Sequence, residues 1–457
     1  MEKREKLSSR LGFILLSAGC AIGLGNVYRF PYIVGKYGGA AFIVIYLCFL
    51  VLLGIPVMTM EFSVGRGSKK SVARSFDVLE PTGTKWHIFG GVGMIGNYLL
   101  MMFYTTITGW MLSFLVKMVS GGFVGKTPEA VGQTFGAMVS NPVENVVYMI
   151  IVVLIGFGVC ALGLNGGVEK VSKFMMTALF ALMIILAFRV VTLPGAAPGI
   201  AFYLKPDFAN LFKNGIGEPL FAAMGQAFFT LSIGMGSMAV FGSYIGDERR
   251  LMGESVNIIL LDTFVALMSG FIVIPSCFAF GVPQDSGMSL VFITLPNIFN
   301  SMKGGRIWGS FFFLFLLFAA LTTVIAVFEN IVCMSMDRWG WDRKKSVAIS
   351  IVAVAILALP AALSGSVLSF IAPLGAGTNI IDLEDFIISN NILPLGSLVY
   401  VLFCTRKNGW GYENFIAEAN KGEGMTFPRK LQFYFSIILP VLILVVFVQG
   451  YYNIFFA

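Results

Sequence analysis

The stretch Ser17-Ala-Gly-Cys-Ala-Ile-Gly-Leu-Gly-Asn-Val-Tyr-Arg-Phe-Pro31 interrupts the first long apolar segment of the chain. It places three glycines, Gly19, Gly23 and Gly25, near the middle of that segment. Each glycine weakens a helix by roughly 1 kcal/mol. Irregular backbone is tolerated in a bilayer only where it lines a cavity or is buried in protein. We therefore expect a broken transmembrane helix here.

The composition around this stretch is that of a membrane protein. Hydrophobic residues make up 57% of the 457 residues and charged residues 12%, whereas a soluble domain has about 25% charged residues. A helix needs roughly 20 apolar residues to cross the hydrocarbon core. We predict an all-α, polytopic membrane protein of about eleven transmembrane helices, near residues 10–36, 39–64, 87–118, 144–163, 171–192, 217–243, 253–281, 307–335, 346–363, 380–404 and 432–455.

The basic residues predict the orientation of these spans. The N-terminal tail and the loops that follow even-numbered spans contain 22 of the 31 Lys and Arg residues, which leaves nine elsewhere. Cytoplasmic loops are enriched in Lys and Arg. We therefore expect a multi-pass protein of the cell membrane with a cytoplasmic N-terminus and an extracellular C-terminus.

The sixth span contains a second glycine-rich interruption, Phe229-Thr-Leu-Ser-Ile-Gly-Met-Gly236. The two interruptions are five spans apart, as two five-helix repeats would place them, and an odd repeat length inverts the second copy. Paired broken helices indicate a binding site at the midplane of the membrane. The alternative is that these glycines only allow close helix packing.

Several motifs resemble those of the neurotransmitter:sodium symporter family. They run from the N-terminus to the tenth span, and the first-span motif is the most specific of them. They are Arg10-Leu-Gly, Gly23-Leu-Gly-Asn-Val-Tyr-Arg-Phe-Pro31, Gly38-Gly-Ala-Ala-Phe42, Gly54-Ile-Pro56 with Glu61, Gln226-Ala-Phe-Phe-Thr-Leu-Ser232 and Ala319-Ala-Leu-Thr-Thr323.

The resemblance implies a LeuT-like fold of two inverted five-helix repeats plus one extra helix. Residues 1–192 would form the first repeat, 193–216 an extracellular loop, 217–405 the second repeat, and 406–457 a cytoplasmic loop and the eleventh helix. The implied function is sodium-coupled import of an amino acid by alternating access. An aromatic substrate is expected, with tyrosine first, since the chain looks most similar to bacterial tyrosine-carrying members.

The resemblance also implies two sodium sites, and Na⁺ takes oxygen ligands as other hard cations do. The first site would use Ala21, Asn26, Thr230 and Asp262. The second would use Gly19, Ile22 and Ala319 with the hydroxyls of Thr322 and Thr323. The alternative for the two threonines is a hydrogen bond to the carbonyl four residues earlier in the same helix.

Asp262 departs from the common family pattern. It lies well inside the seventh span, where a carboxylate is a functional candidate by default. Many family members have an asparagine at this position and bind chloride with a serine four residues later, where this chain has Ala266. We expect transport to be independent of chloride because Asp262 supplies the negative charge. The alternative is a carboxylate paired with a neighbouring helix.

The family pattern further implies a substrate pocket, two gates and one backbone support. Arg29 and Asp385 would pair on the outside, Arg4 and Asp337 on the inside near Tyr244, and Glu61 would hold the unwound sixth span. The predicted substrate-binding residues are Ala21, Gly23, Gly25, Leu100, Tyr104, Phe229, Thr230, Ser232, Met235, Thr323 and Val327.

Other function classes find little support in the sequence. The one histidine, His87, and the spacing of the six cysteines predict neither an enzyme nor a structural metal site. We expect sodium, an amino acid and membrane lipid as partners, with no organic cofactor and no nucleic acid. A passive channel and an amino-acid receptor that does not transport remain the alternatives, and no oligomeric state is predicted.

Overall fold

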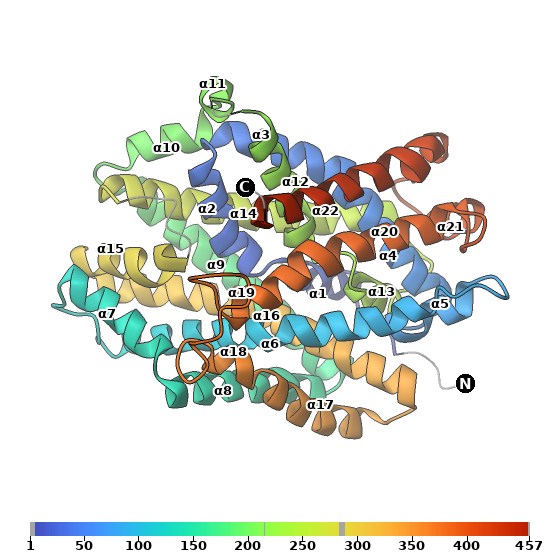
Figure 1. Ribbon diagram of the computed structural model, residues 1–457, viewed down its shortest axis with the longest axis horizontal. Coiled ribbons are helices and arrows are strands. Elements are labelled where there is room, and N and C mark those ends of the chain that lie inside the picture. Colours follow the sequence, from blue (N-terminus) through green and yellow to red (C-terminus); the bar gives the residue numbers. More distant parts are fainter. Residues whose placement is uncertain (1–4, 214, 283–287, 456–457) are drawn as a thin grey trace.

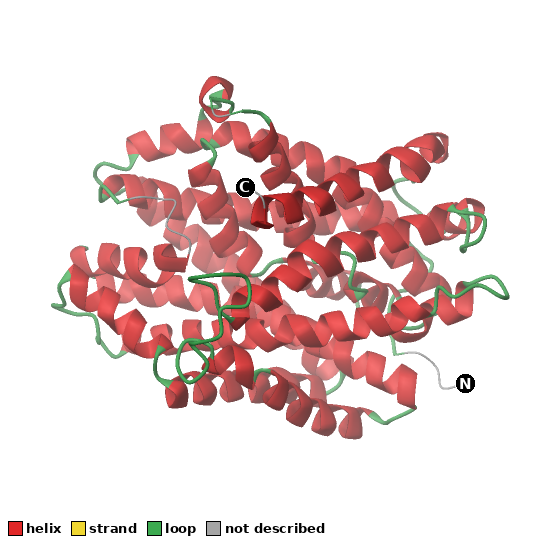
Figure 2. Cartoon of the chain, viewed as in Figure 1, coloured by secondary structure: helices red, strands yellow, loops and turns green. Residues whose placement is uncertain are grey.

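The computed structural model describes residues 5–213, 215–282 and 288–455. Within these ranges the secondary structure is helical, without β-strands (Figure 2). Nine of the described helices are long and apolar enough to cross a membrane, and a bent pair of helices adds a tenth span. The predicted all-α, polytopic membrane fold is confirmed.

The first five spans follow the predicted order, and shorter helices join them. α5 (Val72–Leu79) follows the second span, and α7 (Pro128–Val139) follows the third. The spans are α1 (Arg10–Ala21) with η1 (Gly25–Arg29) and α2 (Phe30–Lys36); α3 (Ala40–Phe49) with η2 (Leu50–Gly54) and α4 (Ile55–Ser68); α6 (Ile88–Val119); α8 (Pro142–Ala161); and η3 (Leu164–Glu169) with α9 (Lys170–Val191).

The sixth predicted span consists of two short helices, α12 (Gly217–Leu231) and α13 (Ser237–Gly242), each below the length that crosses a bilayer. The spans that follow are α14 (Leu251–Ala279); α16 (Gly305–Trp339); α17 (Arg343–Leu357) with α18 (Leu359–Leu363); α19 (Ile380–Ile387) with η5 (Ile388–Ile392) and α20 (Leu393–Thr405); and η7 (Tyr434–Ile438) with α22 (Leu439–Phe455). The connecting elements are α10 (Ala197–Leu204), α11 (Phe208–Leu211), η4 (Leu290–Thr294), α15 (Leu295–Ser301), α21 (Tyr412–Ala419) and η6 (Arg429–Leu431).

Prolines explain most of the wide π-helical turns. Five of these turns, η1, η2, η4, η5 and η7, end two residues before a proline, namely Pro31, Pro56, Pro296, Pro394 and Pro440. A proline has no N–H to donate and its ring clashes with the carbonyl of the preceding turn. The turn widens locally and the helix continues, so the spans stay helical through their prolines.

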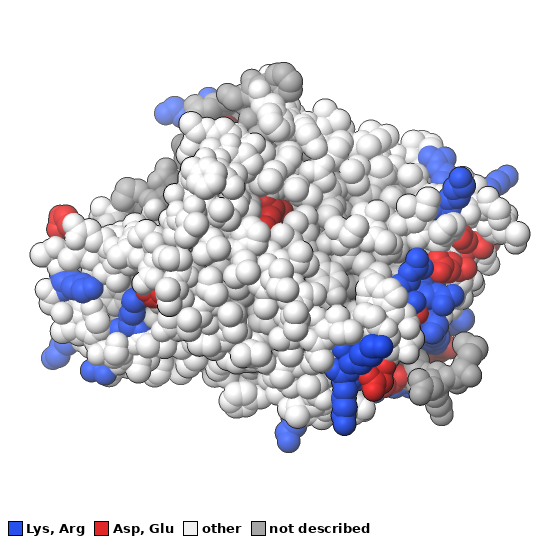
Figure 3. Space-filling view, turned by 60° about the horizontal axis from the view of Figure 1, so that its bottom comes forward, with Lys and Arg blue, Asp and Glu red and all other residues white. Residues whose placement is uncertain are grey.

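The core of the bundle lies along α6 and α16, which cross the middle of the molecule (Figure 1). In the most apolar stretch of α16 83% of the residues are buried, against 28% in the last span, so α16 is central and α22 peripheral. The described N-terminal segment shares one end of the molecule with α5 and α21, and α7 and α15 lie at the other end. Basic side chains gather mainly at the first of these ends (Figure 3).

Candidate functional site

The first break lies between Ala21 and Gly25. Ile22 leaves the helical conformation, with φ −69° and ψ 100°, and the two halves of the span are bent by 56°. Side chains satisfy the amides that the break exposes. Asn26 Oδ1 accepts the Gly23 N–H at 3.1 Å, and the Tyr104 hydroxyl accepts the Leu24 N–H at 3.1 Å. Because the Gly23 N–H is turned to Asn26, the Gly19 carbonyl lacks the N–H partner that a continuous helix would give it.

The second break follows Leu231, the last residue of α12. Ser232 takes a left-handed conformation with φ 51°, and Gly234 and Gly236 have φ 101° and 89°. Such angles suit glycine, which has no Cβ. The predicted break in the sixth span is therefore present, and glycine makes it possible.

Two buried side chains hold the second break in place. Glu61 on α4 accepts the N–H groups of Gly234 at 2.8 Å and Met238 at 2.9 Å, which is the arrangement expected of the predicted backbone support. Asn97 on α6 donates to the Met235 carbonyl at 3.0 Å. The sequence reasoning missed Asn97, although a polar residue in mid-span is itself a signal of function.

Three of the four residues of the first predicted sodium site, Asn26, Thr230 and Asp262, converge between the two breaks. Asn26 Nδ2 lies 2.8 Å from Asp262 Oδ1, and Thr230 Oγ1 lies 3.0 Å from Asp262 Oδ2. All three side chains are fully buried. Among the described residues no Lys, Arg or His pairs with Asp262, and a buried carboxylate without a cation is costly. The oxygen ligands and the negative charge of Asp262, which no basic side chain balances among the described residues, both suit a bound cation.

The residues of the second predicted sodium site form a cluster of oxygens between α1 and α16. Thr323 Oγ1 lies 3.2 Å from the Gly19 carbonyl, 3.0 Å from that of Ile22 and 3.4 Å from that of Ala319. A hydroxyl has one proton and cannot donate to three carbonyls at once, whereas a hard cation accepts all of these oxygens. Thr322 Oγ1 donates to Ala319 within its own helix at 2.9 Å.

A narrow cavity of about 20 Å³ lies beside these residues. Nine of the eleven predicted substrate-binding residues line it. The other two do not: Thr230 turns to Asp262, and Val327 is buried elsewhere. Four lining residues were not predicted, namely Cys20, Leu24, Ile388 and Leu393.

Two glycines of the first break give this cavity its shape. A Cβ at Gly23 would lie 2.4 Å from the Tyr104 hydroxyl and 2.7 Å from Thr323 Oγ1, and a Cβ at Gly25 would lie 2.8 Å from the Phe229 ring. A side chain at either position would displace these groups. The glycines thus let a hydroxyl and an aromatic ring approach the unwound backbone.

The predicted outer gate is not an ion pair in this conformation. No salt bridge joins Arg29 and Asp385 in the part of the chain that the structure describes. The Arg29 guanidinium lies 4.2 Å from the centre of the Phe229 ring, which borders the cavity. Asp385 instead accepts a hydrogen bond from the Ser389 hydroxyl at 2.8 Å. Arg29 and Phe229 together cover the cavity on this side.

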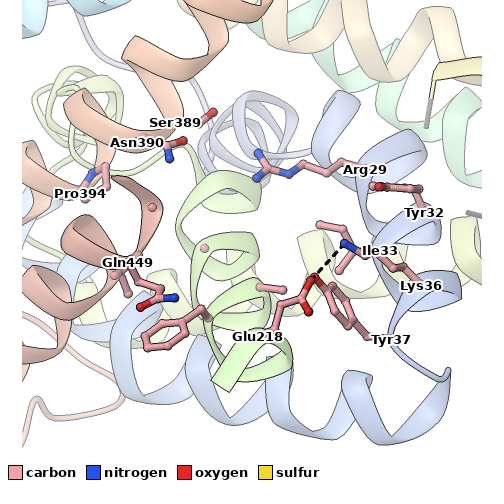
Figure 4. A pocket seen from close by; sticks show the side chains of 15 residues that line it. Arg29, Tyr32, Ile33, Lys36, Tyr37, Glu218, Ser389, Asn390, Pro394 and Gln449 are labelled. Carbon is pink, nitrogen blue, oxygen red and sulfur yellow. Dashed lines mark hydrogen bonds and ion pairs between the residues drawn. The ribbon is translucent and has the colours of Figure 1, made fainter. Parts of the chain in front are cut away.

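A larger pocket of about 330 Å³ lies next to Arg29. Figure 4 shows Arg29 and Lys36 on one side of it and Asn390 and Gln449 on the other. Lys36 pairs with Glu218 at 3.2 Å, and this pair joins α2 to α12. The pocket has the position expected of an outer entrance to the cavity.

At the opposite end of the spans a polar cluster joins several helices. The predicted gate residue Arg4 lies outside the described residues. Asp337 accepts the Ser71 N–H at 2.7 Å and lies 3.4 Å from Lys70 Nζ. Tyr244 donates to Glu329 at 2.9 Å, and Glu329 holds Arg343 through two contacts of 2.7 and 2.9 Å. The sequence reasoning missed the Glu329–Arg343 pair, although Glu329 is an intramembrane carboxylate.

Comparisons with known proteins agree with this geometry. Residues 4–125 and 135–455 match the sequence profile of the sodium:neurotransmitter symporter family. The chain is 32% identical, over 98% of both chains, to YhdH, an uncharacterised sodium-dependent transporter of Bacillus subtilis (strain 168). It is 26% identical to the sodium- and chloride-dependent GABA transporter 2 of Bos taurus, over 90% of this chain and 73% of that one.

A solved structure, that of MhsT in complex with L-phenylalanine, matches with a TM-score of 0.87 and 36% identity, over 98% of this chain and 100% of that one. The chain belongs to the sodium:neurotransmitter symporter family. It is therefore a sodium-dependent, multi-pass membrane transporter and not an enzyme.

Proposed function

We propose that this symporter imports an aromatic amino acid, tyrosine first, together with sodium bound at two sites. The observation that carries the proposal is the cavity between the two breaks. Its lining combines the unwound backbone at Gly23 and Gly25 with the apolar side chains of Leu100, Phe229 and Met235. Asn26, which accepts the Gly23 N–H, also contacts Asp262. A zwitterion with a large apolar side chain has the complementary distribution of charge and surface.

The main chain would hold the charged ends of the substrate. α12 ends at Leu231, beside the cavity, and the carbonyl end of a helix carries partial negative charge that favours an ammonium group. The Tyr104 hydroxyl and the backbone near Gly23 would hold the carboxylate, next to sodium at the first site. The phenylalanine bound to MhsT supports an aromatic side chain, and the flexible Met235 adapts to such rings.

Chloride independence follows from the charge at the first site. Asp262 has no basic partner among the described residues, so it can balance a bound sodium by itself. Ala266, one helical turn later, offers no hydroxyl to an anion. The proposed transporter therefore needs no chloride beside its cation, unlike the sodium- and chloride-dependent relative.

Alternating access requires that the two covers of the cavity open in turn. Arg29 with Phe229 would form the outer cover, and Asp337 with the cluster around Tyr244 and Glu329 the inner one. The N-terminus would be cytoplasmic, since the basic loops lie at its end of the molecule.

Uptake into proteoliposomes tests the proposal. We expect labelled tyrosine to accumulate only under an inward sodium gradient, equally well in chloride and in gluconate. Unlabelled phenylalanine and tryptophan should compete, and γ-aminobutyrate should not. Uptake that equilibrates without accumulating would indicate a channel, binding without uptake would indicate a receptor, and a loss of uptake in gluconate would refute chloride independence.

A further inference from the structure

A second, narrow apolar cleft lies away from the transport site, among α9, α14, α15 and α16. Most of its lining side chains are buried, and Arg189, Met302 and Trp308 at its mouth are partly exposed. The lining residues are Leu186, Arg189, Val190, Leu193, Ile272, Ser276, Leu295, Phe299, Met302, Trp308 and Phe312. The cleft is thus a narrow apolar slot with one cation at its entrance.

The position of the cleft is that of a membrane interface. Arg189 lies in the last turn of α9, and Trp308 lies in the first turn of α16. Both line the cleft together with Leu295 and Phe299 of α15, and α15 lies with α7 at one end of the molecule (Figure 1). Tryptophan is enriched at the depth of lipid headgroups. Next to Arg189, the side chain of Phe188 is 74% exposed.

The entrance of the cleft is positively charged. Arg189 contacts the Thr192 hydroxyl at 3.1 Å and lies 5.5 Å from the Trp308 ring. Lys303 and Arg306 lie on the adjoining turn and are exposed. Within residues 5–213, 215–282 and 288–455, none of these three cations pairs with a carboxylate. Arg189, Lys303 and Arg306 are among the nine Lys and Arg residues that lie outside the tail and loops predicted to be cytoplasmic.

The interior of the cleft does not suit a polar ligand. Ser276 provides its one hydroxyl, and that hydroxyl donates to the Ile272 carbonyl at 2.7 Å. The remaining wall, apart from Arg189 at the entrance, consists of apolar side chains and could not hold a zwitterion. A ligand with an apolar chain and an anionic head has the matching chemistry.

We propose that the cleft binds one acyl chain of an anionic glycerophospholipid, with the lipid phosphate against Arg189 and Lys303. A basic side chain near the membrane surface contributes about 1 kcal/mol to the binding of anionic lipid. The apolar wall holds the chain because burial of its methylene groups removes apolar surface from water. Both terms act together at this cleft.

Native mass spectrometry of the purified full chain, titrated with phosphatidylglycerol or with phosphatidylcholine of the same acyl chains, tests the site. We expect one phosphatidylglycerol to bind more tightly than phosphatidylcholine. Arg189→Gln should weaken that binding about fivefold, and so should Lys303→Gln. Lys205→Gln, which removes an exposed cation away from the cleft, is the matched control and should leave the affinity unchanged.

Ser276→Leu separates the acyl chain from the headgroup, because it fills the slot and keeps Arg189. We expect it too to weaken phosphatidylglycerol binding, in protein that remains monodisperse and takes up substrate. Unchanged binding in this variant would overturn occupation of the cleft by an acyl chain. Equal affinities for the two lipids, or unchanged binding in both Arg189→Gln and Lys303→Gln, would overturn recognition of an anionic headgroup.

Discussion

The two predicted sodium sites lie on opposite sides of the first break and obtain their negative charge differently. The first is centred on one full charge, Asp262, which Asn26 and Thr230 contact. The second consists of neutral oxygens, among them the Gly19 and Ile22 carbonyls around Thr323. Sodium binding at the first site therefore depends mainly on one residue. At the second site, several neutral dipoles share the stabilisation of the ion.

The largest expected effect comes from Asp262→Asn, because it removes the one full charge of the first site. Loss of one partner from a buried ion pair costs about 3–5 kcal/mol, so sodium-driven uptake should fall by at least about 100-fold. Uptake in proteoliposomes measures it. The exposed Asp247→Asn serves as the control, and near-normal uptake by Asp262→Asn would remove the distinction between the two sites.

The double variant Asp262→Asn/Ala266→Ser sharpens the same point. It introduces the asparagine and the serine that many chloride-binding family members have at these two positions. We expect part of the lost uptake to return in chloride and not in gluconate. A double variant that responds equally to the two anions would mean that Asp262 does not stand in for chloride.

The next effect concerns Glu61, which holds the unwound backbone of the sixth span. Glu61→Gln places an amide group against one of the N–H groups that the carboxylate now accepts. An unsatisfied buried donor costs about 1–3 kcal/mol, so we expect uptake to fall by about 30-fold. Hydrogen exchange at Gly234 and Met238 should speed up. Unaltered exchange would show that Glu61 does not hold this break.

The second site should respond more mildly to loss of a ligand. Thr323→Val removes an oxygen that lies near three carbonyls, whereas the hydroxyl of Thr322 reaches one carbonyl in its own helix. The sodium concentration for half-maximal uptake should rise about tenfold in Thr323→Val and about threefold in Thr322→Val. The reverse order would contradict the observed geometry of the second site.

The smallest effect is expected at the outer gate. Asp385 contacts Ser389 and forms no ion pair with Arg29 in the described conformation. Exposed charge pairs contribute about 0–1 kcal/mol, so Asp385→Asn should change uptake by less than about fivefold. A loss as large as that of Asp262→Asn would place the gate among the determinants of sodium binding.

The sequence predicted the breaks well because their cause is local. Glycine clusters weaken a helix wherever they occur, so Gly23 and Gly234 could be placed in broken spans without knowledge of their neighbours. The spans could be counted from apolar length alone. In the structure the helix halves of the first and sixth spans are each too short to cross a bilayer, so helix length alone would miss these two spans.

Contacts between distant spans could not be read in the same way. Asn97 and Glu329 are polar residues in mid-span, which is a signal of function without an indication of the partner. Their partners, Met235 and Arg343, became evident only when the helices were packed together. Ile388 and Leu393 reach the cavity from a wide turn before Pro394, which the apolar pattern of the tenth span does not reveal.

Equilibrium binding of radioactive sodium to the purified chain, in the presence of saturating tyrosine, tests the division between the two sites most directly. The wild-type chain should bind two sodium ions, and Asp262→Asn should bind one, with an affinity that Thr323→Val then lowers further. A single sodium ion on the wild-type chain, or two on Asp262→Asn with unchanged affinity, would contradict a charged first site beside a neutral second one.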